Sequence, residues 1–377
     1  MNKTSKIIIG IIVVIVAIGI WYGVSKNQAT VKNQVFIEKT PIKIGVLAPL
    51  TGKAAIFGED AKNALSLVLE KEDVNKQVEL IYEDEMCDPQ TAITAYRSLR
   101  LKGVNVIIGA FCSPSTLAIA PLAEQDKVIL ITPASSAETI SQAGDYIFRN
   151  HVFSSQRGIK LGEFAANKFD SIATIYDKSN DAFVLTEKSL VEKIQEKNKI
   201  VLERQGVLGT ATDFKTELIK IKASKPSAIY IGTLMPISAL IVKQMKELNM
   251  TAQIIADDAT VIDKNFLDAI GNMSEEIFFV SSDFDQETNL EFWNLYTERF
   301  GKNPTVFAAQ SYDNLMILAN IISEKCKNGD SICVKEYLYQ IKNYSGVSGS
   351  TTFDVNGDAV KSLIIKTIKN GQLTKVK

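Results

Sequence analysis

Histidine is almost absent from this sequence, and its scarcity narrows the chemistry that the chain can perform. His151 is the single histidine among 377 residues, which limits catalysis of the Ser-His-Asp or Cys-His type, where histidine is the usual base. The sequence also has no nucleophile elbow, no zinc-binding motif and no P-loop. We therefore expect a protein that is not an enzyme, with no cofactor and no bound metal, and we interpret His151 as structural.

An excess of either charge is also missing. The 42 lysines and arginines balance 43 aspartates and glutamates, for a formal net charge of -1, so nothing indicates a nucleic-acid partner. The hydrophobic share of 46% supports a core, and the length favours more than one domain. We expect a monomer. The acidic run Glu83–Asp84–Glu85 lacks the alternating ligands of a calcium loop, so we interpret it as a solvated loop edge.

The sequence has one long apolar run at its N-terminus. This run spans residues 7–24, close to the shortest length that crosses a bilayer, and Lys3 and Lys6 precede it. Lysines on this side place the rest of the chain outside the cytoplasm. The run is either a transmembrane anchor, through which the protein contacts the membrane, or a cleaved signal sequence. We assign residues 1–25 to this anchor or signal helix and the polar residues 26–40 to a linker.

Cysteine is scarce, and its even count in an exported protein favours disulfides. Cys87, Cys112, Cys326 and Cys333 allow three pairings. Cys87 and Cys112 each follow a predicted strand, in loops that can meet at one edge of a sheet. Cys326 and Cys333 flank KNGDSI, a turn between two helical patterns. We favour the pairs Cys87–Cys112 and Cys326–Cys333. A metal site is the weaker alternative, because His151 is not near a CxxC motif.

Apolar strands alternate with amphipathic helices from Pro41 onward. A first series of strands comprises KIGVLAP, VELIYED, VNVIIGA and VILIT, and a second comprises SIATIYD, KIVLER, SAIYIG, AQIIAD and EIFFVS. This alternation predicts an α/β protein with parallel, doubly wound sheets. So many strands suit two sheets better than one. We therefore expect two lobes with a hinge and a cleft between them.

The stretch from Val104 to Ser136 is the most informative part of the sequence. It reads as strand, polar loop, helix, strand and polar loop, in VNVIIGAFCSPST, LAIAPLAEQDK and VILITPASS. Parallel strands place the loops around Ser113 and Ser136 at one sheet edge, where open α/β sheets bind ligands. Pro114 favours a helix that begins beside Ser113, which we predict to be its N-cap. Two hydroxyls beside a helix N-terminus suit a small carboxylate.

Several of these segments together resemble a known family. The order KIGVLAPLTGKAAIFGED, YEDEMCDPQTA, IIGAFCSPST, ILITPASS and FDVNGD is similar to the type I periplasmic binding proteins. More narrowly, it is similar to the branched-chain amino-acid receptors of ABC transporters, the Leu/Ile/Val-binding type. The resemblance covers essentially all of residues 41–377, and it also implies the Cys87–Cys112 disulfide.

The resemblance implies a fold of two Rossmann-like lobes joined by three crossovers, which act as the hinge. The crossovers would lie near residues 151–156, 280–284 and 354–360. Lobe 1 would comprise residues 41–152 and 283–354, and lobe 2 would comprise residues 153–282 and 355–377.

The resemblance assigns several ligand contacts to lobe 1. Ser113 matches the serine that binds the ligand carboxylate, and Ser136 falls where relatives often carry a ligand-binding threonine. Ala134 would offer its backbone carbonyl to an ammonium group, and Phe57 would pack on the ligand. The structural alternatives are helix capping for Ser113, an ordinary loop or an N-cap for Ser136, and core packing for Phe57.

Lobe 2 would close on the amine end of the ligand. Asp258 matches the acid that meets the α-ammonium, with Asp257 as its rival. Two binding positions depart from the family, which usually has aromatic residues where this chain has Asp181 and Leu234. A shifted alignment places Phe183 at the first of these. Losing both rings weakens the case for Leu, Ile or Val, and an acid at position 181 would suit a polar or cationic side chain.

The sequence therefore predicts an extracytoplasmic solute-binding protein of an ABC transporter, either periplasmic or anchored at the cell surface. It would bind an amino acid or a similar small carboxylate and deliver it to ABC permease subunits, with closure of the two lobes burying the ligand. The alternative is a ligand-sensing ectodomain that works with a separate signalling partner, because the same fold serves in receptor ectodomains.

Overall fold

The computed structural model describes residues 12–22, 40–71, 74, 76–234, 236–261, 271, 277–284, 286–287, 289–369 and 372–376. The chain divides into two units, residues 1–40 and residues 41–377. In the first unit, residues 12–22 form a helix. Among the described residues, no helix combines the length and the apolar character needed to cross a membrane. Residues 1–11 and 23–39, which include both ends of the predicted apolar run, lie outside the described residues.

The second unit begins with a parallel sheet whose strands run in the order β2-β1-β3-β4-β5. Alternate residues of these strands enter two separate apolar clusters. Helices α2 and α13 contribute to one cluster, and α4 and α5 to the other, so the sheet is covered on both faces as parallel sheets require. The elements are β1 (Ile42–Ala48), α2 (Ala55–Leu69), β2 (Val78–Asp84), α4 (Pro89–Leu101), β3 (Val106–Gly109), α5 (Ser113–Asp126), β4 (Ile129–Thr132) and β5 (Ile147–Arg149).

A second, seven-stranded sheet runs in the order β14-β13-β10-β9-β8-β6-β7. Its strands β6 to β10 are parallel, as predicted. The last two strands differ, because β13 is antiparallel to β10 and β14 is antiparallel to β13. Only residues 370–371 separate β13 from β14, too few for the crossover that a parallel pair needs. The strands are β6 (Ser171–Asp177), β7 (Ile200–Val207), β8 (Ala228–Gly232), β9 (Gln253–Asp257), β10 (Ile277–Ser282), β13 (Leu363–Lys369) and β14 (Gln372–Lys375).

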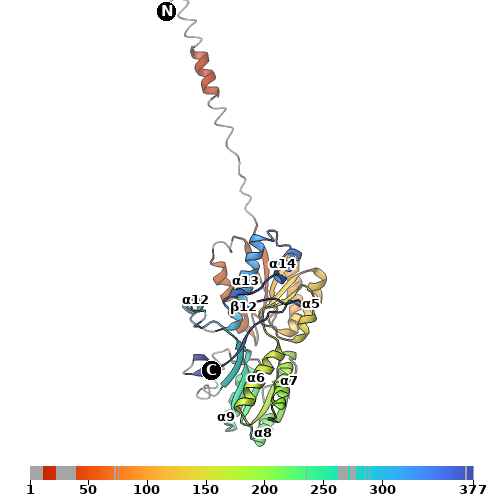
Figure 1. Cartoon of the computed structure of the whole chain (residues 1–377). Coiled ribbons are helices and arrows are strands. Elements are labelled where there is room, and N and C mark those ends of the chain that lie inside the picture. The colour runs from red at the N-terminus through yellow and green to blue at the C-terminus, as the bar shows by residue number, and fades with distance from the viewer. Residues whose placement is uncertain are drawn as a thin grey trace, which may run out of the picture. The chain divides into compact units, whose positions relative to one another are not determined.

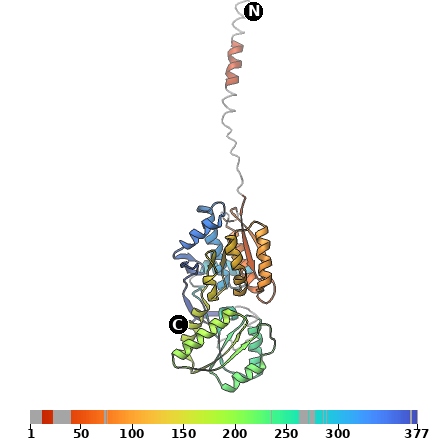
Figure 2. The same ribbon diagram turned by 90° about the vertical axis from the view of Figure 1, so that its right-hand side faces the viewer.

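Helices surround each sheet, and the chain returns to the first sheet after β10. Helix α13 packs against α2, although β10 and β13 on either side of it belong to the second sheet. We call the first sheet with its helices lobe 1 and the second sheet with its helices lobe 2; Figures 1 and 2 show them as separate layers. The exact lobe boundaries remain predictions. The remaining elements are α6 (Ser154–Lys168), α7 (Asp181–Glu196), α8 (Lys215–Ser224), α9 (Ile237–Glu247), α10 (Asp258–Val261), α12 (Leu290–Phe300), α13 (Val306–Glu324), α14 (Ser331–Tyr339), β11 (Tyr344–Gly346) and β12 (Gly349–Thr351).

Two of the predicted crossovers lie side by side. The Arg149 guanidinium is buried and forms an ion pair with Asp358 at 2.5 Å. The backbone adds two bonds, from Arg149 N to Gly357 O at 2.9 Å and from Ala359 N to Arg149 O at 2.8 Å. Since residue 149 precedes the predicted crossover near 151–156 and residue 358 lies within the one near 354–360, these bonds link the two predicted crossovers.

Both favoured disulfides are present. Cys87 pairs with Cys112 across a Cα–Cα distance of 5.3 Å, and Cys326 pairs with Cys333 across 5.8 Å. The first disulfide joins the loop after β2 to the start of α5. The second joins the end of α13 to the first turn of α14. The loops that carry Cys87 and Cys112 lie close together because β2 and β3 are both neighbours of β1 in one parallel sheet.

Candidate functional site

A cavity opens between the carboxyl ends of strands from both lobes. Of the seven ligand-binding residues predicted from the sequence, five line this cavity, namely Phe57, Ser113, Ala134, Ser136 and Leu234. Its volume is about 60 Å³, room for a handful of water molecules. The structure adds residues that sequence reasoning did not assign to the ligand: Phe111, Cys112, His151, Arg157, Asn180, Ala182, Thr186, Ala259 and Phe307.

The two serine loops meet directly on the lobe 1 side. The Ser113 hydroxyl oxygen accepts hydrogen bonds from the backbone N–H groups of Ser136, at 3.0 Å, and Ala137, at 3.2 Å. The predicted N-cap role of Ser113 is wrong by one residue, since α5 begins at Ser113 and its N-cap is Cys112. The side chain of Ser113 is used by the neighbouring loop instead. Because a hydroxyl has two acceptor positions and one hydrogen, its hydrogen remains available for an acceptor in the cavity.

A network of hydroxyls fixes the loop that carries Ser136. The side chains of Thr116, Thr132 and Ser135 all donate to the carbonyl oxygen of Ala110, at 2.5 to 3.2 Å. On the other side, Ser154 at the start of α6 donates its backbone N–H to the carbonyl of Ser136 at 2.8 Å. Ser113 and Ser136, which we call the serine seat, are therefore held by buried hydroxyls and by Ser154, which lies within the first predicted crossover.

Apolar side chains form another part of the wall. Phe57 and Phe307 pack edge to face with ring centroids 5.1 Å apart, and Phe111, Phe183 and Leu234 also line the cavity. All but Leu234 are almost completely buried. Such a wall provides apolar area and offers no charge to a ligand side chain.

Asp181 does not reach the cavity. The sequence placed it in a loop, but it is the first residue of α7 and is exposed to solvent. Asn180 is the N-cap, and its side chain accepts from the backbone N–H of Ala182 at 3.0 Å. A helix that begins here turns Asp181 outward and Phe183 inward, so the shifted alignment matches the structure better. The structure therefore gives no support to the expectation that Asp181 would suit a ligand with a cationic side chain.

Two acids and one base form a buried cluster on the lobe 2 side. Arg157 contacts Asp258 Oδ1 through Nη2 at 2.5 Å, and contacts Asp257 Oδ1 at 3.1 Å from Nη2 and 3.3 Å from Nε. Asp257 lines the cavity with Arg157, whereas Asp258 lies beside it in the wall. The other carboxylate oxygen of Asp257, Oδ2, accepts a hydrogen bond from the Tyr230 hydroxyl at 2.9 Å.

Burial and neighbouring charge act on this cluster in opposite directions. Burial raises the pKa of Asp257, and Arg157 lowers it in part. For Arg157, burial lowers the pKa, but Asp258 and Asp257 outweigh that effect and raise it overall. The guanidinium is therefore charged. Asp258 Oδ2 is buried without a hydrogen-bond partner among the described residues.

His151 connects the cluster to lobe 1, a role that the sequence did not reveal. Arg157 Nη1 lies 3.1 Å from His151 Nε2, and His151 Nδ1 lies 3.1 Å from Gln310 Oε1 on α13. Because a guanidinium can only donate, Nε2 accepts and Nδ1 carries the hydrogen. Burial lowers the pKa of His151 to about 3, helped by Arg157, so the imidazole is neutral. Its partners lie 6 and 159 residues away in the sequence, and the distant one has no sequence signal.

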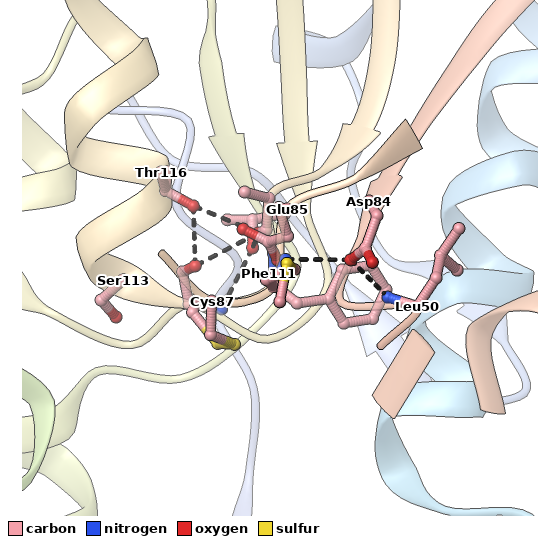
Figure 3. Close-up of a disulfide and its surroundings, with 12 residues drawn as sticks. Leu50, Asp84, Glu85, Cys87, Phe111, Ser113 and Thr116 are labelled. Carbon is pink, nitrogen blue, oxygen red and sulfur yellow. Dashed lines mark hydrogen bonds between the residues drawn. A yellow bond between two sulfur atoms is a disulfide. The ribbon is translucent and has the colours of Figure 1, made fainter. Parts of the chain in front are cut away.

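A further buried acid, Glu85, lies close to the Cys87–Cys112 disulfide (Figure 3). Glu85 is fully buried, which corrects its interpretation as part of a solvated loop edge. Its Oε1 accepts from the backbone N–H of Phe111 at 2.7 Å, and burial raises its pKa to about 8. Glu85, Cys87 and Cys112 lie close enough together to suggest metal ligands. The disulfide leaves the two sulfur atoms without the thiolate that binds metals.

Two curated relatives resemble this chain in sequence. An amino acid binding protein of Pseudomonas aeruginosa is 30% identical over 234 residues, which are 59% of this chain and 62% of that protein. That alignment thus spans less than two thirds of the relative. The leucine-, isoleucine-, valine-, threonine- and alanine-binding protein of the same species is 25% identical over 332 residues, which are 84% of this chain and 87% of that protein.

Solved structures share the fold over nearly the whole second unit. A leucine binding protein from Thermotoga maritima matches with a TM-score of 0.82 and 28% identity, over 89% of this chain and 98% of that one. A solute binding protein of an ABC transporter from Rhodopseudomonas palustris, in complex with 3,4-dihydroxy benzoic acid, matches with a TM-score of 0.80 and 24% identity, over 89% and 96%.

The family described as periplasmic binding protein matches residues 41–372. That range includes the first sheet, strands β6 to β10 and β13 of the second sheet, and every cavity residue named above. The resemblance to the Leu/Ile/Val-binding type is confirmed by the named relatives. The chain therefore belongs to the periplasmic binding protein family.

Proposed function

We propose that this protein is the solute-binding component of an ABC transporter and that it binds an amino acid in the cavity between its lobes. The observation that carries the proposal is that two serine hydroxyls line the cavity while the buried acid Asp258 lies between two of its lining residues, Asp257 and Ala259. Ser113 and Ser136 would donate to the ligand carboxylate, as charge-assisted bonds that are stronger than neutral ones. Ala134 would accept from the ammonium through its carbonyl.

The acid on the lobe 2 side supports the amine end of this ligand. Asp258 has one buried oxygen without a partner among the residues that the structure describes, and an orphaned acceptor of this kind is costly. An α-ammonium that donates to Oδ2 would remove that cost. Asp257 is less suited, because Arg157 and Tyr230 already occupy both of its oxygens. We therefore keep Asp258 as the ammonium partner.

The cavity wall supports an uncharged, apolar side chain. Phe57, Phe183, Phe307 and Leu234 surround the space, and burying aliphatic surface among them is favourable by about 25 cal/mol per Å². The relatives whose names include leucine, isoleucine and valine point in the same direction. We propose a small aliphatic amino acid as the ligand.

Membership of the family implies an extracytoplasmic location and a partnership with an ABC permease. We propose that residues 7–24 direct the chain to the outer side of the membrane, either as a retained anchor or as a cleaved signal. Uptake of the ligand by cells that lack this chain, compared with cells in which it is restored, would test the transport role. A sensor would change signalling and leave uptake unaltered.

A thermal-shift screen of the purified chain against amino acids, amides and small carboxylates tests the binding role. A ligand at a hundredfold excess over Kd stabilises the folded state by about 2.7 kcal/mol. We expect the largest shift with an aliphatic amino acid and a loss of at least about tenfold in affinity in D258N. The matched control is D170N, because the Asp170 side chain is 98% exposed. Equal binding by D258N and the wild type would contradict the assignment.

A further inference from the structure

Arg157 is the part of the cavity wall that the proposed function leaves unused. It lies near the start of α6, is 3% exposed and lines the cavity. Burying a guanidinium is costly unless it is paired and hydrogen-bonded. Here three of its nitrogens have partners: Nε and Nη2 contact the two acids, and Nη1 contacts His151. These contacts hold the guanidinium, and therefore its positive charge, in one position.

The charge of this cluster depends on Arg157. Among the described residues, Arg157 is the cation that contacts both Asp257 and Asp258, so without the arginine both carboxyl groups would lose that contact. The other charged groups nearby are already paired, Glu187 with Arg204 at 2.7 Å and Arg149 with Asp358 at 2.5 Å, and the Tyr230 hydroxyl is neutral. Arg157 is therefore the counter-ion within this cluster.

The contact between Arg157 and Asp258 affects whether a ligand must carry an ammonium group. In a site where the acid stands alone, a carboxylate ligand without an ammonium leaves a buried and uncompensated charge. In this protein, Asp258 Oδ1 already contacts a guanidinium nitrogen at 2.5 Å and accepts from Ala259 N at 2.9 Å. In the part of the chain that the structure describes, no donor contacts Asp258 Oδ2. The ligand's ammonium is therefore an added contact rather than a requirement.

We propose that Arg157 is a specificity-determining residue that allows the site to accept small monocarboxylates both with and without an α-ammonium group. The inference rests on the proposed binding function and names its ligand class more broadly. The serine seat would hold the carboxylate of either kind of ligand. Arg157 would keep Asp258 compensated when the ammonium is missing.

The experiment compares two probes that differ only in the ammonium group, L-valine and 3-methylbutanoate. Calorimetry on the purified chain gives Kd for each, and the ratio of the two values is the readout. In the wild type we expect the carboxylate to bind no more than about tenfold more weakly than valine. In R157Q we expect this ratio to rise by at least about tenfold, because Asp258 loses its counter-ion.

Three further variants separate charge from folding. R157K keeps the charge, so its ratio should stay near that of the wild type. If R157Q does not fold, the double variant R157Q/D257N buries one charge fewer and should show the same rise. R299Q makes the same substitution in an exposed ion pair outside the cavity and should leave the ratio unchanged.

The outcomes distinguish this inference from the proposed function. If the wild type binds neither probe, the proposed function fails and the inference fails with it. If the wild type binds valine but not 3-methylbutanoate, or if R157Q binds both with an unaltered ratio, the role of Arg157 is overturned and the binding function stands.

Discussion

The Ser113 hydroxyl oxygen lies 3.0 Å from the backbone nitrogen of Ser136 and accepts its hydrogen bond. One side chain thus positions the neighbouring ligand loop and keeps its own hydrogen for the cavity. In S113A both contributions are lost, and a hydrogen bond to a charged group contributes about 1.5–3 kcal/mol. We expect ligand affinity to fall by about tenfold to a hundredfold, measured by calorimetry.

Two other variants make the Ser113 prediction specific. S113T keeps the hydroxyl and should restore most of the affinity. S227A removes an exposed serine just before β8, at the opposite end of that strand from Leu234, and should bind like the wild type. Binding by S113A that equals the wild type would show that the ligand carboxylate lies elsewhere.

Glu85 makes stability depend on pH. Its pKa is about 8 in the folded state because of burial, against 4.5 as the ordinary value, so the folded state binds a proton that the unfolded state releases. Stability from this group is therefore complete below pH 4.5 and is lost as the pH rises to about 8. E85Q removes this dependence. Relative to the wild type, its free energy of unfolding should rise by more than about 1 kcal/mol between pH 5 and pH 8.

Urea denaturation at several pH values measures this difference. E79Q is the matched control, because Glu79 is exposed on the same strand β2, and its difference from the wild type should not vary with pH. A difference for E85Q that is constant over the same range would show that Glu85 is ionised throughout and that its burial is offset by hydrogen bonds.

The two disulfides should contribute unequally to stability. Cys87 and Cys112 are 25 residues apart, whereas Cys326 and Cys333 are 7 apart. The chain-entropy relation gives about 3.5 kcal/mol for the longer loop and about 2.4 kcal/mol for the shorter one. We expect C87S/C112S to lose more stability in denaturant titrations than C326S/C333S, and to lose ligand affinity as well, because Cys112 lines the cavity beside Ser113. The reverse order of stability would contradict the entropic explanation.

Sequence patterns predicted the features of this fold that arise from local order along the chain. The strands around Val106 and Ile129 are continuous apolar runs, and such runs between helices specify a parallel sheet and its ligand edge. The same pattern predicted that the loops of Ser113 and Ser136 lie at one edge of the sheet, where the two residues are in contact. The Asn-Gly pair between the last two strand patterns is a hairpin signal, but the sequence did not predict that β13 pairs with β10, a strand about 80 residues earlier across three intervening helices.

Two of the errors in the site concern a partner that the sequence does not specify, and the third concerns the start of a helix. Arg157 belongs to the site because it hydrogen-bonds to two carboxylates that lie 100 and 101 residues away in the sequence. Ser113 follows a helix-start pattern, yet its oxygen is used by a loop 23 residues later. For Asp181, the decisive fact was the residue at which α7 begins, and helix ends are uncertain by one or two residues from pattern alone.

A bond between the lobes should control how long the ligand stays. Lys53, in the loop before α2, donates to the Gly209 carbonyl oxygen after β7 at 2.9 Å, and this pair joins lobe 1 to lobe 2. If the lobes close over the ligand, the bond exists only in the closed form. K53A should therefore speed ligand release by about twofold to fivefold and leave the association rate unchanged, since an exposed bond contributes up to about 1 kcal/mol. Stopped-flow kinetics measure both rates. K62A removes another exposed lysine of lobe 1 and is the control. A slower association with unaltered release would show that Lys53 acts on the open form instead.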